Sequence, residues 1–393
     1  MRNLILKATA FLAVIGIFVN CAVVSAHSEN GKNYNIETTI EEDFDCKSVI
    51  LMEATTGTVL HEKNADQALP PASVTKIMTL LLVMEAYCNN KIQLTDMVTA
   101  SANACSMGGS QIYLKEGEQM SVEDMIKSVV IASANDAAVA LAEHIEGSEE
   151  AFVKKMNEKA KELGMNNTNF ENTNGLDDTA VNHVTSARDI AIMSRELIKH
   201  EKITEYSSIW MDTIRNGEFG LTNTNRLVRF YKGATGLKTG STSKAGFCIS
   251  ATASRNGMTL ICVVMAASTR DTRNQIATKL LDWGFSNFLL YKNNGEIIDN
   301  IKVTGGTDAT VSAAYQDFCA VVEKNKAKEI EITKSIPDSV QAPIINGQTI
   351  GNITYKINSQ ILGESPLTAS ETVEKMDFYT MFFKIFSKII FRI

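Results

Sequence analysis

Apolar and polar positions alternate in several distinct patterns along this 393-residue chain, and each pattern predicts a structural element. Apolar runs flank Thr56-Gly57, and longer ones flank Asn256-Gly257, a dipeptide that favours a two-residue hairpin turn. Apolar residues recur with helical spacing after Ser121 and after Ser186, and each serine stands where a helix N-cap is expected. The predicted strands are 48–52, 58–60, 235–240, 247–254 and 258–267, and the predicted helices are 74–84, 121–131, 136–145, 186–198 and 280–290.

Helices that lie between β-hairpins, without regular βαβ alternation, predict a largely antiparallel sheet with helices packed on it. We assign this α/β domain to residues 47–290. From about Tyr291 the pattern changes to short alternating strands separated by Gly-rich and Asn-Gly turns. Residues 291–368 are therefore predicted to form a small all-β domain.

The last residues of the chain, 374–393, are rich in Phe and Ile. Lys384, Lys388 and Arg392 recur every four residues, so on a helix they form one charged stripe opposite a wide apolar surface. Such a helix is poorly suited to spanning a bilayer and well suited to lying at a membrane surface. A packed core helix is the alternative.

The first residues have the form of a secretory signal. Arg2 and Lys7 precede an apolar run over 8–19, and small residues end at Ala26. We expect cleavage after Ala26, so that 1–26 is a signal peptide and 27–46 a linker. The alternative is an uncleaved anchor, but the run is short for a spanning helix. Export would place the protein at the outer face of the cytoplasmic membrane or in the cell wall.

Composition narrows the class of protein. Hydrophobic residues make up 45% and charged residues 21% of the chain, as in ordinary folded soluble proteins. The formal net charge of −7 argues against nucleic acid as a partner, because that affinity needs a basic surface. Six cysteines remain after the predicted signal, an even number that permits disulfides, but no two have Cys-x-x-Cys spacing. Cys248 and Cys262 lie in apolar strand patterns, which predicts buried free thiols.

Ser73-Val74-Thr75-Lys76 places a hydroxyl and an amine one turn apart on a helix that carries no other charge as far as Met84. Burial would lower the pKa of Lys76 and make it a possible general base for a serine nucleophile. A second copy of the string, Ser241 to Lys244, lies in a polar stretch without an apolar helix, and we interpret it as a turn.

Two further short motifs carry candidate catalytic or binding residues. Lys238-Thr239-Gly240 lies on a predicted strand, and Ser133-Ala134-Asn135 lies at a junction between two predicted helices. The second string also occurs elsewhere in the chain, so its position at the junction, followed by Asp136-Ala137-Ala138, is what singles out Ser133.

With these motifs the chain resembles the serine D-alanyl-D-alanine carboxypeptidases, the low-molecular-mass penicillin-binding proteins. The resemblance covers about residues 47–285 closely and extends more loosely over the β-domain and tail. It implies a serine β-lactamase/DD-peptidase-like domain, an antiparallel sheet flanked by helices. Further matching strings are Gly109-Ser110 with Tyr113-Leu114, Leu163-Gly164-Met165, and 183–189 from His183 to Asp189.

The resemblance also implies roles. Ser73 would attack the bond between two terminal D-alanines of a peptidoglycan stem peptide, Lys76 would take its proton, Ser133 would relay that proton to the leaving amine, and Asn135 would hold the substrate or orient Lys76. Lys238 and Thr239 would bind the terminal carboxylate. Backbone amides of Ser73 and of Ser241, after Gly240, would form the oxyanion hole. β-Lactams would acylate Ser73, and no cofactor or metal is needed.

Other functions on the same fold stay open at this point. A β-lactamase needs a group that hydrolyses the acyl-enzyme, and Glu162 with Asn166 has the spacing used in class A enzymes. Glu162 ends a charged helix, however, so a solvated position is expected. A DD-endopeptidase and a non-catalytic cell-wall-binding scaffold are the remaining alternatives.

Overall fold

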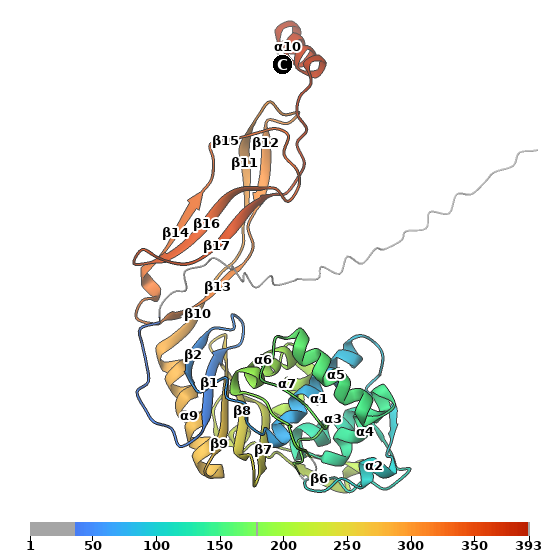
Figure 1. Ribbon diagram of the computed structural model, residues 1–393. Helices are drawn as coiled ribbons and strands as arrows, with labels where there is room; N and C mark the ends of the chain where they lie inside the picture. The colour runs from blue at the N-terminus through green and yellow to red at the C-terminus, as the bar shows by residue number, and fades with distance from the viewer. Residues whose placement is uncertain (1–35, 178–179, 392–393) are drawn as a thin grey trace, which may run out of the picture.

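The computed structural model describes residues 36–177 and 180–391. It forms an elongated molecule, with a mixed α/β domain at one end, an all-β domain beyond it and a single helix at the far tip (Figure 1). The predicted signal peptide, 1–26, and residues 27–35 of the predicted linker lie outside the described residues.

The α/β domain is built on a sheet of order β2-β1-β9-β8-β7, and every neighbouring pair in it is antiparallel. This confirms the predicted antiparallel sheet. Its strands are β1 (Ser48–Glu53), β2 (Val59–Lys63), β7 (Ala234–Thr242), β8 (Gly246–Arg255) and β9 (Met258–Ala267). β7 lies at one edge, so one side of its backbone is not covered by a neighbouring strand of this sheet.

Helices cover both faces of this sheet (Figure 1). The helical elements are η1 (Ala72–Thr75), α1 (Lys76–Cys88), α2 (Ala102–Cys105), α3 (Val122–Lys127), η2 (Ser128–Ala132), α4 (Asn135–Glu146), α5 (Glu149–Glu162), α6 (Ala187–Leu197), α7 (Glu201–Ser207), η3 (Arg215–Gly217), α8 (Leu227–Phe230) and α9 (Arg270–Asn287). Two small hairpins, β3 (Met97–Thr99) with β4 (Gln119–Ser121) and β5 (Met211–Ile214) with β6 (Phe219–Thr222), complete the domain.

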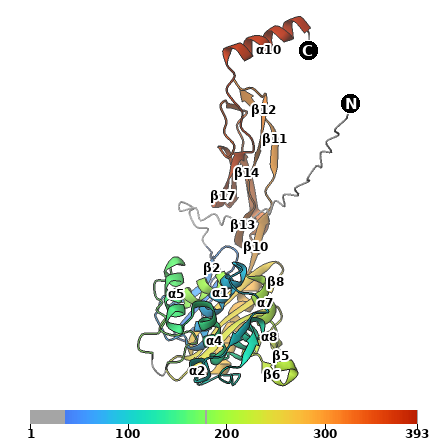
Figure 2. The same cartoon turned by 90° about the vertical axis from the view of Figure 1, so that its right-hand side faces the viewer.

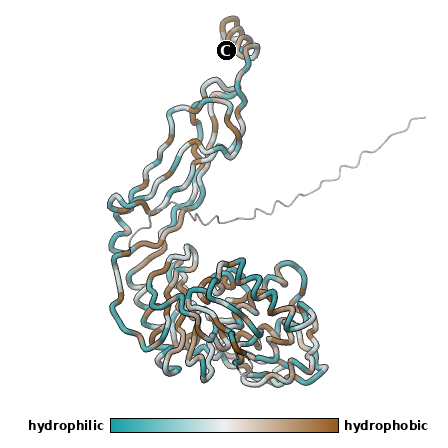
Figure 3. Tube along the Cα trace, viewed as in Figure 1, coloured by the Kyte–Doolittle hydropathy of each residue, from teal (hydrophilic) through white to brown (hydrophobic). Residues whose placement is uncertain are grey.

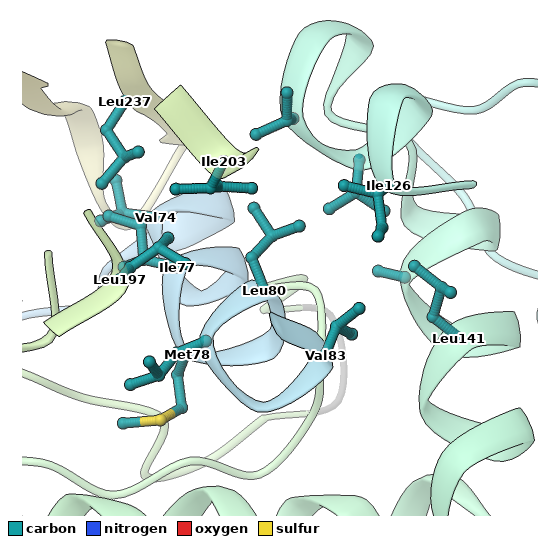
Figure 4. Close-up of a cluster of buried hydrophobic side chains, with 14 of the residues drawn as sticks. Val74, Ile77, Met78, Leu80, Val83, Ile126, Leu141, Leu197, Ile203 and Leu237 are labelled. Carbon is teal, nitrogen blue, oxygen red and sulfur yellow. The ribbon is translucent and has the colours of Figure 1, made fainter. Parts of the chain in front are cut away.

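Helix α1 lies at the centre of the larger hydrophobic core. Ile77, Leu80 and Val83 are fully buried, and side chains from α3, α4, α6, α7 and β7 surround them (Figure 4). A helix that is apolar on all sides requires this position, because no face of it can be left in water at low cost. A second core lies between the opposite face of the sheet and α9.

Two of the predicted helices differ from those in the structure. The last helix of the domain was predicted over 280–290, but α9 is Arg270–Asn287 and starts where the Thr269 side chain accepts from Thr272 N. Phe288 to Leu290 instead begin β10, because their backbone pairs with 321–323 of β13. The helix predicted over 121–131 is α3 followed by the π-helix η2, with Ser121 as the observed N-cap.

The all-β domain contains a sheet of order β14-β16-β17-β12-β11-β15 and the pair β10-β13. The strands are β10 (Phe288–Asn293), β11 (Ile297–Thr304), β12 (Thr310–Ala314), β13 (Phe318–Glu323), β14 (Ile330–Ser335), β15 (Ser339–Gln341), β16 (Thr349–Ile357) and β17 (Gln360–Ala369), with η4 (Ala327–Glu329). Its own core includes Phe318 stacked on Tyr355, with ring centroids 3.9 Å apart.

Part of the predicted linker packs against both domains. Phe44 is buried in the core beside α9, and Thr38 donates from its backbone N and its hydroxyl to Glu323 Oε1 at 2.7 and 2.5 Å. Residues 36–46 therefore connect the base of the β-domain to the core between the sheet and α9. They are irregular in conformation, as a linker is, and still make specific contacts.

The tail forms α10 (Phe378–Phe391), which starts four residues later than the predicted 374. Val373 and Lys375 are held by isolated bridges to Ile344 and Gly306, so the helix cannot start before them. Hydrophobic positions recur along α10, which lies at the tip of the β-domain (Figure 3). Lys384 of this helix donates to the carbonyl of Thr307 at 2.9 Å. Within the described residues, no helix combines the length and apolar character needed to cross a bilayer.

Candidate active site

Ser73 and Lys76 face one another where η1 continues into α1. Nζ of Lys76 donates to Ser73 Oγ at 3.0 Å. Lys76 is fully buried, whereas Ser73 is partly exposed. Ser73 and Lys76, which their spacing predicted to share one helical face, are therefore in direct contact. The serine is partly exposed and the lysine amine is buried.

The Lys76 amine has two further partners. It donates to Asn135 Oδ1 at 2.5 Å and to the backbone carbonyl of Asn174 at 2.7 Å. Burial, followed by the positive charge of nearby Lys238, lowers the pKa of Lys76 well below its ordinary value of 10.5, and the Asp136 carboxylate partly opposes this. The arrangement holds the amine in place and favours its neutral form, which can accept a proton.

Ala72, next to Ser73, has left-handed backbone with φ of +50°, which is unusual for a residue with a Cβ. Its carbonyl accepts from Thr75 Oγ1 at 2.8 Å, and Thr75 Oγ1 lies 2.7 Å from His183 Nε2. His183 Nδ1 accepts from Glu171 N, so the imidazole is neutral, with its proton on Nε2. Burial lowers the pKa of His183 to about 4, which keeps this chain of contacts intact at neutral pH.

Ser133 follows the π-helix η2 and has left-handed backbone, with φ of +65°. Its Oγ accepts from Lys238 Nζ at 2.8 Å. Lys238 lies on β7 and also donates to the carbonyl of Thr239 at 2.9 Å. Burial, and then the charge of Arg273 behind the sheet, lower the pKa of Lys238 to about 7. Local strain of this kind is found at functional sites, where surrounding contacts maintain it.

Asn135 is the first residue of α4, and its amide is oriented from both sides. Oδ1 accepts from Lys76, and Nδ2 donates to Gly108 O at 2.6 Å. Asp136 beside it accepts backbone N–H bonds from Ile112 and Leu114. The helix junction thus connects the Lys76 amine to the segment 108–114.

Strand β7 passes unusually close to η1 at Gly240. A Cβ at this position would lie 2.8 Å from Ser73 N and 2.9 Å from Val74 N. Thr239 Oγ1 donates to Thr224 Oγ1 at 2.9 Å, and Ser241 is exposed. Gly240 is therefore what allows the edge of the sheet to approach the backbone amide of Ser73.

The structure brings together Ser73, Lys76, Ser133, Asn135 and the strand residues Lys238 to Ser241. Of the second Ser-x-x-Lys copy, only Ser241 lies beside them. Ser241 and Thr242 end β7, so the predicted turn begins only at Ser243, and exposed Lys244 points to Asp177, where it donates to the backbone carbonyl. Glu162 is two-thirds exposed and pairs with Lys159 at 2.8 Å, on the solvated face predicted for it.

The sequence analysis did not identify two loops that contribute to the site, the one with Asn174 and Gly175 and the one with Thr224. The carbonyl of Asn174 holds Lys76, and Gly175 has φ of +86°, where a Cβ would lie 1.9 Å from Ala72 O. Thr224, which contacts Thr239, was also missed. The turn-forming string Asn172-Thr173-Asn174-Gly175 marked a tight turn, but nothing in it indicated contact with η1.

The six cysteines in the described part of the chain are free thiols, and Cys248 and Cys262 are buried as predicted. Among residues 36–177 and 180–391, no group of three His, Cys, Asp or Glu side chains is arranged to hold a metal ion.

Comparison with known protein families matches residues 35–269 to the D-alanyl-D-alanine carboxypeptidase family and 285–375 to the C-terminal domain of penicillin-binding protein 5. The chain belongs to the D-alanyl-D-alanine carboxypeptidase family. The D-alanyl-D-alanine carboxypeptidase DacF of Bacillus subtilis is 43% identical over 93% of this chain and 95% of its own length. DacC of Escherichia coli is 35% identical over 87% and 88%.

Solved structures agree with this assignment. Penicillin-binding protein 5 from Haemophilus influenzae superposes with a TM-score of 0.77 at 33% identity, over 86% of this chain and 100% of that one. Penicillin-binding protein D2 from Listeria monocytogenes, solved with ampicillin bound, gives 0.58 at 32% identity over 63% and 100%. The predicted family, fold class and function as a serine D-Ala-D-Ala carboxypeptidase are confirmed, in preference to the alternatives.

Proposed function

We propose that Ser73 is the nucleophile that removes the terminal D-alanine from peptidoglycan stem peptides, with Lys76 as its general base. The observation that carries this proposal is the 3.0 Å contact between a partly exposed Ser73 Oγ and the fully buried Lys76 Nζ. A neutral amine at that distance can take the hydroxyl proton as the serine attacks.

In the first half-reaction, Ser73 Oγ bonds to the carbonyl carbon between the two D-alanines and its proton moves to Lys76 Nζ. The carbon–nitrogen bond then breaks, and the leaving amine receives the proton through Ser133. This releases D-alanine and leaves an ester on Ser73. In the second half-reaction water attacks the ester carbonyl carbon and gives a proton to Lys76 Nζ. The carbon–oxygen bond to Ser73 then breaks, Lys76 passes that proton to Ser73 Oγ, and the shortened peptide leaves with a new terminal carboxyl group.

Developing charge on the carbonyl oxygen would be met by the backbone amides of Ser73 and Ser241. Two features support this assignment. The approach of Gly240 to Ser73 N brings the two backbone segments together, and β7 is the edge strand of its sheet. Donors fixed in a partly buried site stabilise an oxyanion without reorganising.

The terminal carboxylate of the substrate would bind Lys238 and the Thr239 hydroxyl. Lys238 is buried and its present partners, Ser133 Oγ and Thr239 O, are neutral, so a carboxylate would supply the missing opposite charge. This makes the site selective for a chain end, and it favours carboxypeptidase over endopeptidase action. Asn135 would hold the substrate amide with the hydrogen-bonding capacity left after Lys76 and Gly108.

The decisive test is release of D-alanine from a peptide ending in D-Ala-D-Ala. Wild type should release it, and Ser73→Ala should reduce the rate by at least about 10³-fold. Equal rates would end this proposal. Ser243→Ala, in the exposed β7–β8 turn, is a matched control and should retain full activity.

β-Lactams would acylate Ser73 as mimics of the D-Ala-D-Ala terminus. The ampicillin-bound relative supports this, and the exposed Glu162 offers no group for rapid hydrolysis of the adduct. A fluorescent penicillin should label wild type for a long time and leave Ser73→Ala unlabelled. Rapid turnover of the drug would favour a β-lactamase.

For the rest of the chain, we propose export directed by residues 1–26 and attachment of α10 to the membrane surface. Large apolar side chains on α10 are at least 45% exposed, among them Phe382, Phe383 and Ile389, and Lys384 is the only charge between Phe378 and Ser387. We also propose that the catalytic unit ends with α9 at Asn287, because β10 pairs with β13 of the following domain.

A further inference from the structure

Arginine and aromatic side chains gather on the surface formed by β5 and α8. We refer to Trp210, Met211, Arg226, Arg229 and Phe230 as the arginine-aromatic patch. The Arg229 guanidinium lies 5.3 Å from the ring centroids of both Trp210 and Phe230, and Arg226 lies 5.8 Å from Phe230. Phe230 is 66% and Met211 64% exposed. Large apolar groups and cations thus face water together.

The two arginines of the patch lack acidic partners. Among the described residues, neither guanidinium forms an ion pair or a side-chain hydrogen bond, whereas Arg188, Arg215 and Arg255 each pair with a carboxylate. The Trp210 Nε1 atom is buried and also has no hydrogen-bond partner there. In a chain with a net charge of −7, two adjacent unpaired arginines are a local exception.

One turn connects the arginine-aromatic patch to Lys238 and Thr239, the residues proposed to bind the terminal carboxylate. Thr224 contacts Thr239 at 2.9 Å, and Asn225 Nδ2 donates to Gly236 O on β7 at 2.8 Å. Arg226 follows directly, and α8 leads into the strand that carries Lys238. In Figure 2, α8 lies at the same edge of the domain as β5 and β6. A polymer with one end in the site can therefore reach the patch.

We propose that the arginine-aromatic patch binds a further stretch of the same peptidoglycan strand whose stem peptide occupies the active site. This rests on the proposed function, since it assumes that peptidoglycan is the substrate. Guanidinium groups that lie over aromatic rings and have no acidic partner keep N–H donors for carboxylates of neighbouring stem peptides. The exposed side chains of Phe230 and Met211 offer apolar surface for sugar rings and aliphatic side chains.

The test compares a soluble peptide ending in D-Ala-D-Ala with insoluble peptidoglycan stripped of other polymers, using the full chain in detergent. The variants are Arg226→Gln with Arg229→Gln, and Phe230→Ala. Their kcat/KM on the peptide should stay within about twofold, whereas release of D-alanine from peptidoglycan should fall at least fivefold. Cosedimentation with peptidoglycan should weaken by a similar factor in both, and only in the double arginine variant should it become less dependent on salt.

Lys154→Gln with Lys161→Gln is the matched control, because both lysines are exposed on α5 and the change of charge is equal. Equal losses in the control and patch variants, or no loss in the patch variants, would overturn the proposal. So would cosedimentation that occurs only when phosphate-bearing polymers are left on the peptidoglycan. A wild type that is inactive on the soluble peptide would instead contradict the proposed function, and the cosedimentation result would still decide the role of the patch.

Discussion

Lys76 and Lys238 show how one residue type serves two tasks within a single site. Both are buried, and burial is the main cause that lowers the pKa of each. Lys76 has a serine hydroxyl, an amide oxygen and a carbonyl as partners, so its neutral form can act as a base. Lys238 lies where an anionic chain end would restore its charge. The two lysines therefore differ in role because their neighbouring groups differ.

At the residue scale, the pH dependence of Ser73 acylation reports on Lys76. Its pKa is lowered, so the amine is protonated and inactive only below that lowered value, and acylation should rise with pH through it. The acylation rate with a fluorescent penicillin, measured from pH 5 to 11, should reach its plateau well below the ordinary lysine pKa of about 10.4. A single inflection near that ordinary value would contradict a depressed base.

Deprotonation of Lys238 should weaken binding of the substrate carboxylate at alkaline pH. Its pKa is about 7, so above that pH the free enzyme loses the positive charge that meets the substrate carboxylate. KM for a peptide ending in D-Ala-D-Ala should therefore rise as pH increases above about 7, with little change in kcat. Lys238→Gln should raise KM about 10- to 100-fold at pH 6.

A substrate ending in an amide provides the control for Lys238. It carries no terminal charge, so its KM should not follow the titration of Lys238. Identical alkaline dependence for the acid and the amide would show that Lys238 does not recognise the terminal carboxylate.

At the scale of elements, the site depends on three backbone segments that approach one another closely. Gly175 permits its loop to touch Ala72, Gly240 permits β7 to touch η1, and the left-handed Ser133 ends the π-helix η2. The contact from His183 to Thr75 connects the loop to η1. Small displacements of any of these segments would separate the Ser73 hydroxyl from its partners.

Gly240→Ala tests this dependence. The added Cβ would lie within 3 Å of backbone atoms of Ser73 and Val74, so β7 must move away from η1. We expect acylation of Ser73 by penicillin to slow about 100-fold, a size typical of lost geometry at a catalytic centre. Stopped-flow labelling with fluorescent penicillin measures it.

Gly220→Ala is the matched control for that substitution. Gly220 also lies in a strand, β6, and a Cβ there would meet nothing within 4 Å. It should acylate at the wild-type rate. If both variants acylate normally, close approach of β7 to η1 is not required for the reaction.

At the scale of the whole molecule, the β-domain separates the catalytic domain from α10 (Figure 1). If α10 lies on a membrane, the active site is held away from that surface and can reach substrate in the wall. The segment 36–46 supports the base of this arrangement, since Thr38 contacts Glu323 at the end of β13.

Liposome flotation tests the role of α10. The full chain should float with vesicles that contain phosphatidylglycerol, and a chain ending at Asp377 should remain in solution, because residues 378–391 carry the exposed apolar surface. Ending at Asp377 leaves the bridges at Val373 and Lys375 in place, so the β-domain keeps its contacts.

A full-length variant, Phe383→Asp with Ile389→Asp, controls for chain length in the flotation assay. Both side chains are more than 60% exposed, so their replacement leaves the cores intact. It should also fail to float. Equal flotation of all three proteins would contradict the proposal that α10 attaches the protein to a membrane surface.

The sequence by itself determined the family, the antiparallel sheet and the pairing of Ser73 with Lys76, because periodicity, capping residues and residue spacing act locally. The predicted bounds of α9 and the predicted start of α10 were wrong, since Phe288 to Leu290 pair with a distant strand and the bridges at Val373 and Lys375 delay the last helix. Only the tertiary structure decided that the Asn174 carbonyl holds Lys76, that Thr224 meets Thr239, and that Arg226 and Arg229 stand unpaired beside aromatic rings. These contacts join segments up to about a hundred residues apart, and no local pattern encodes such a meeting.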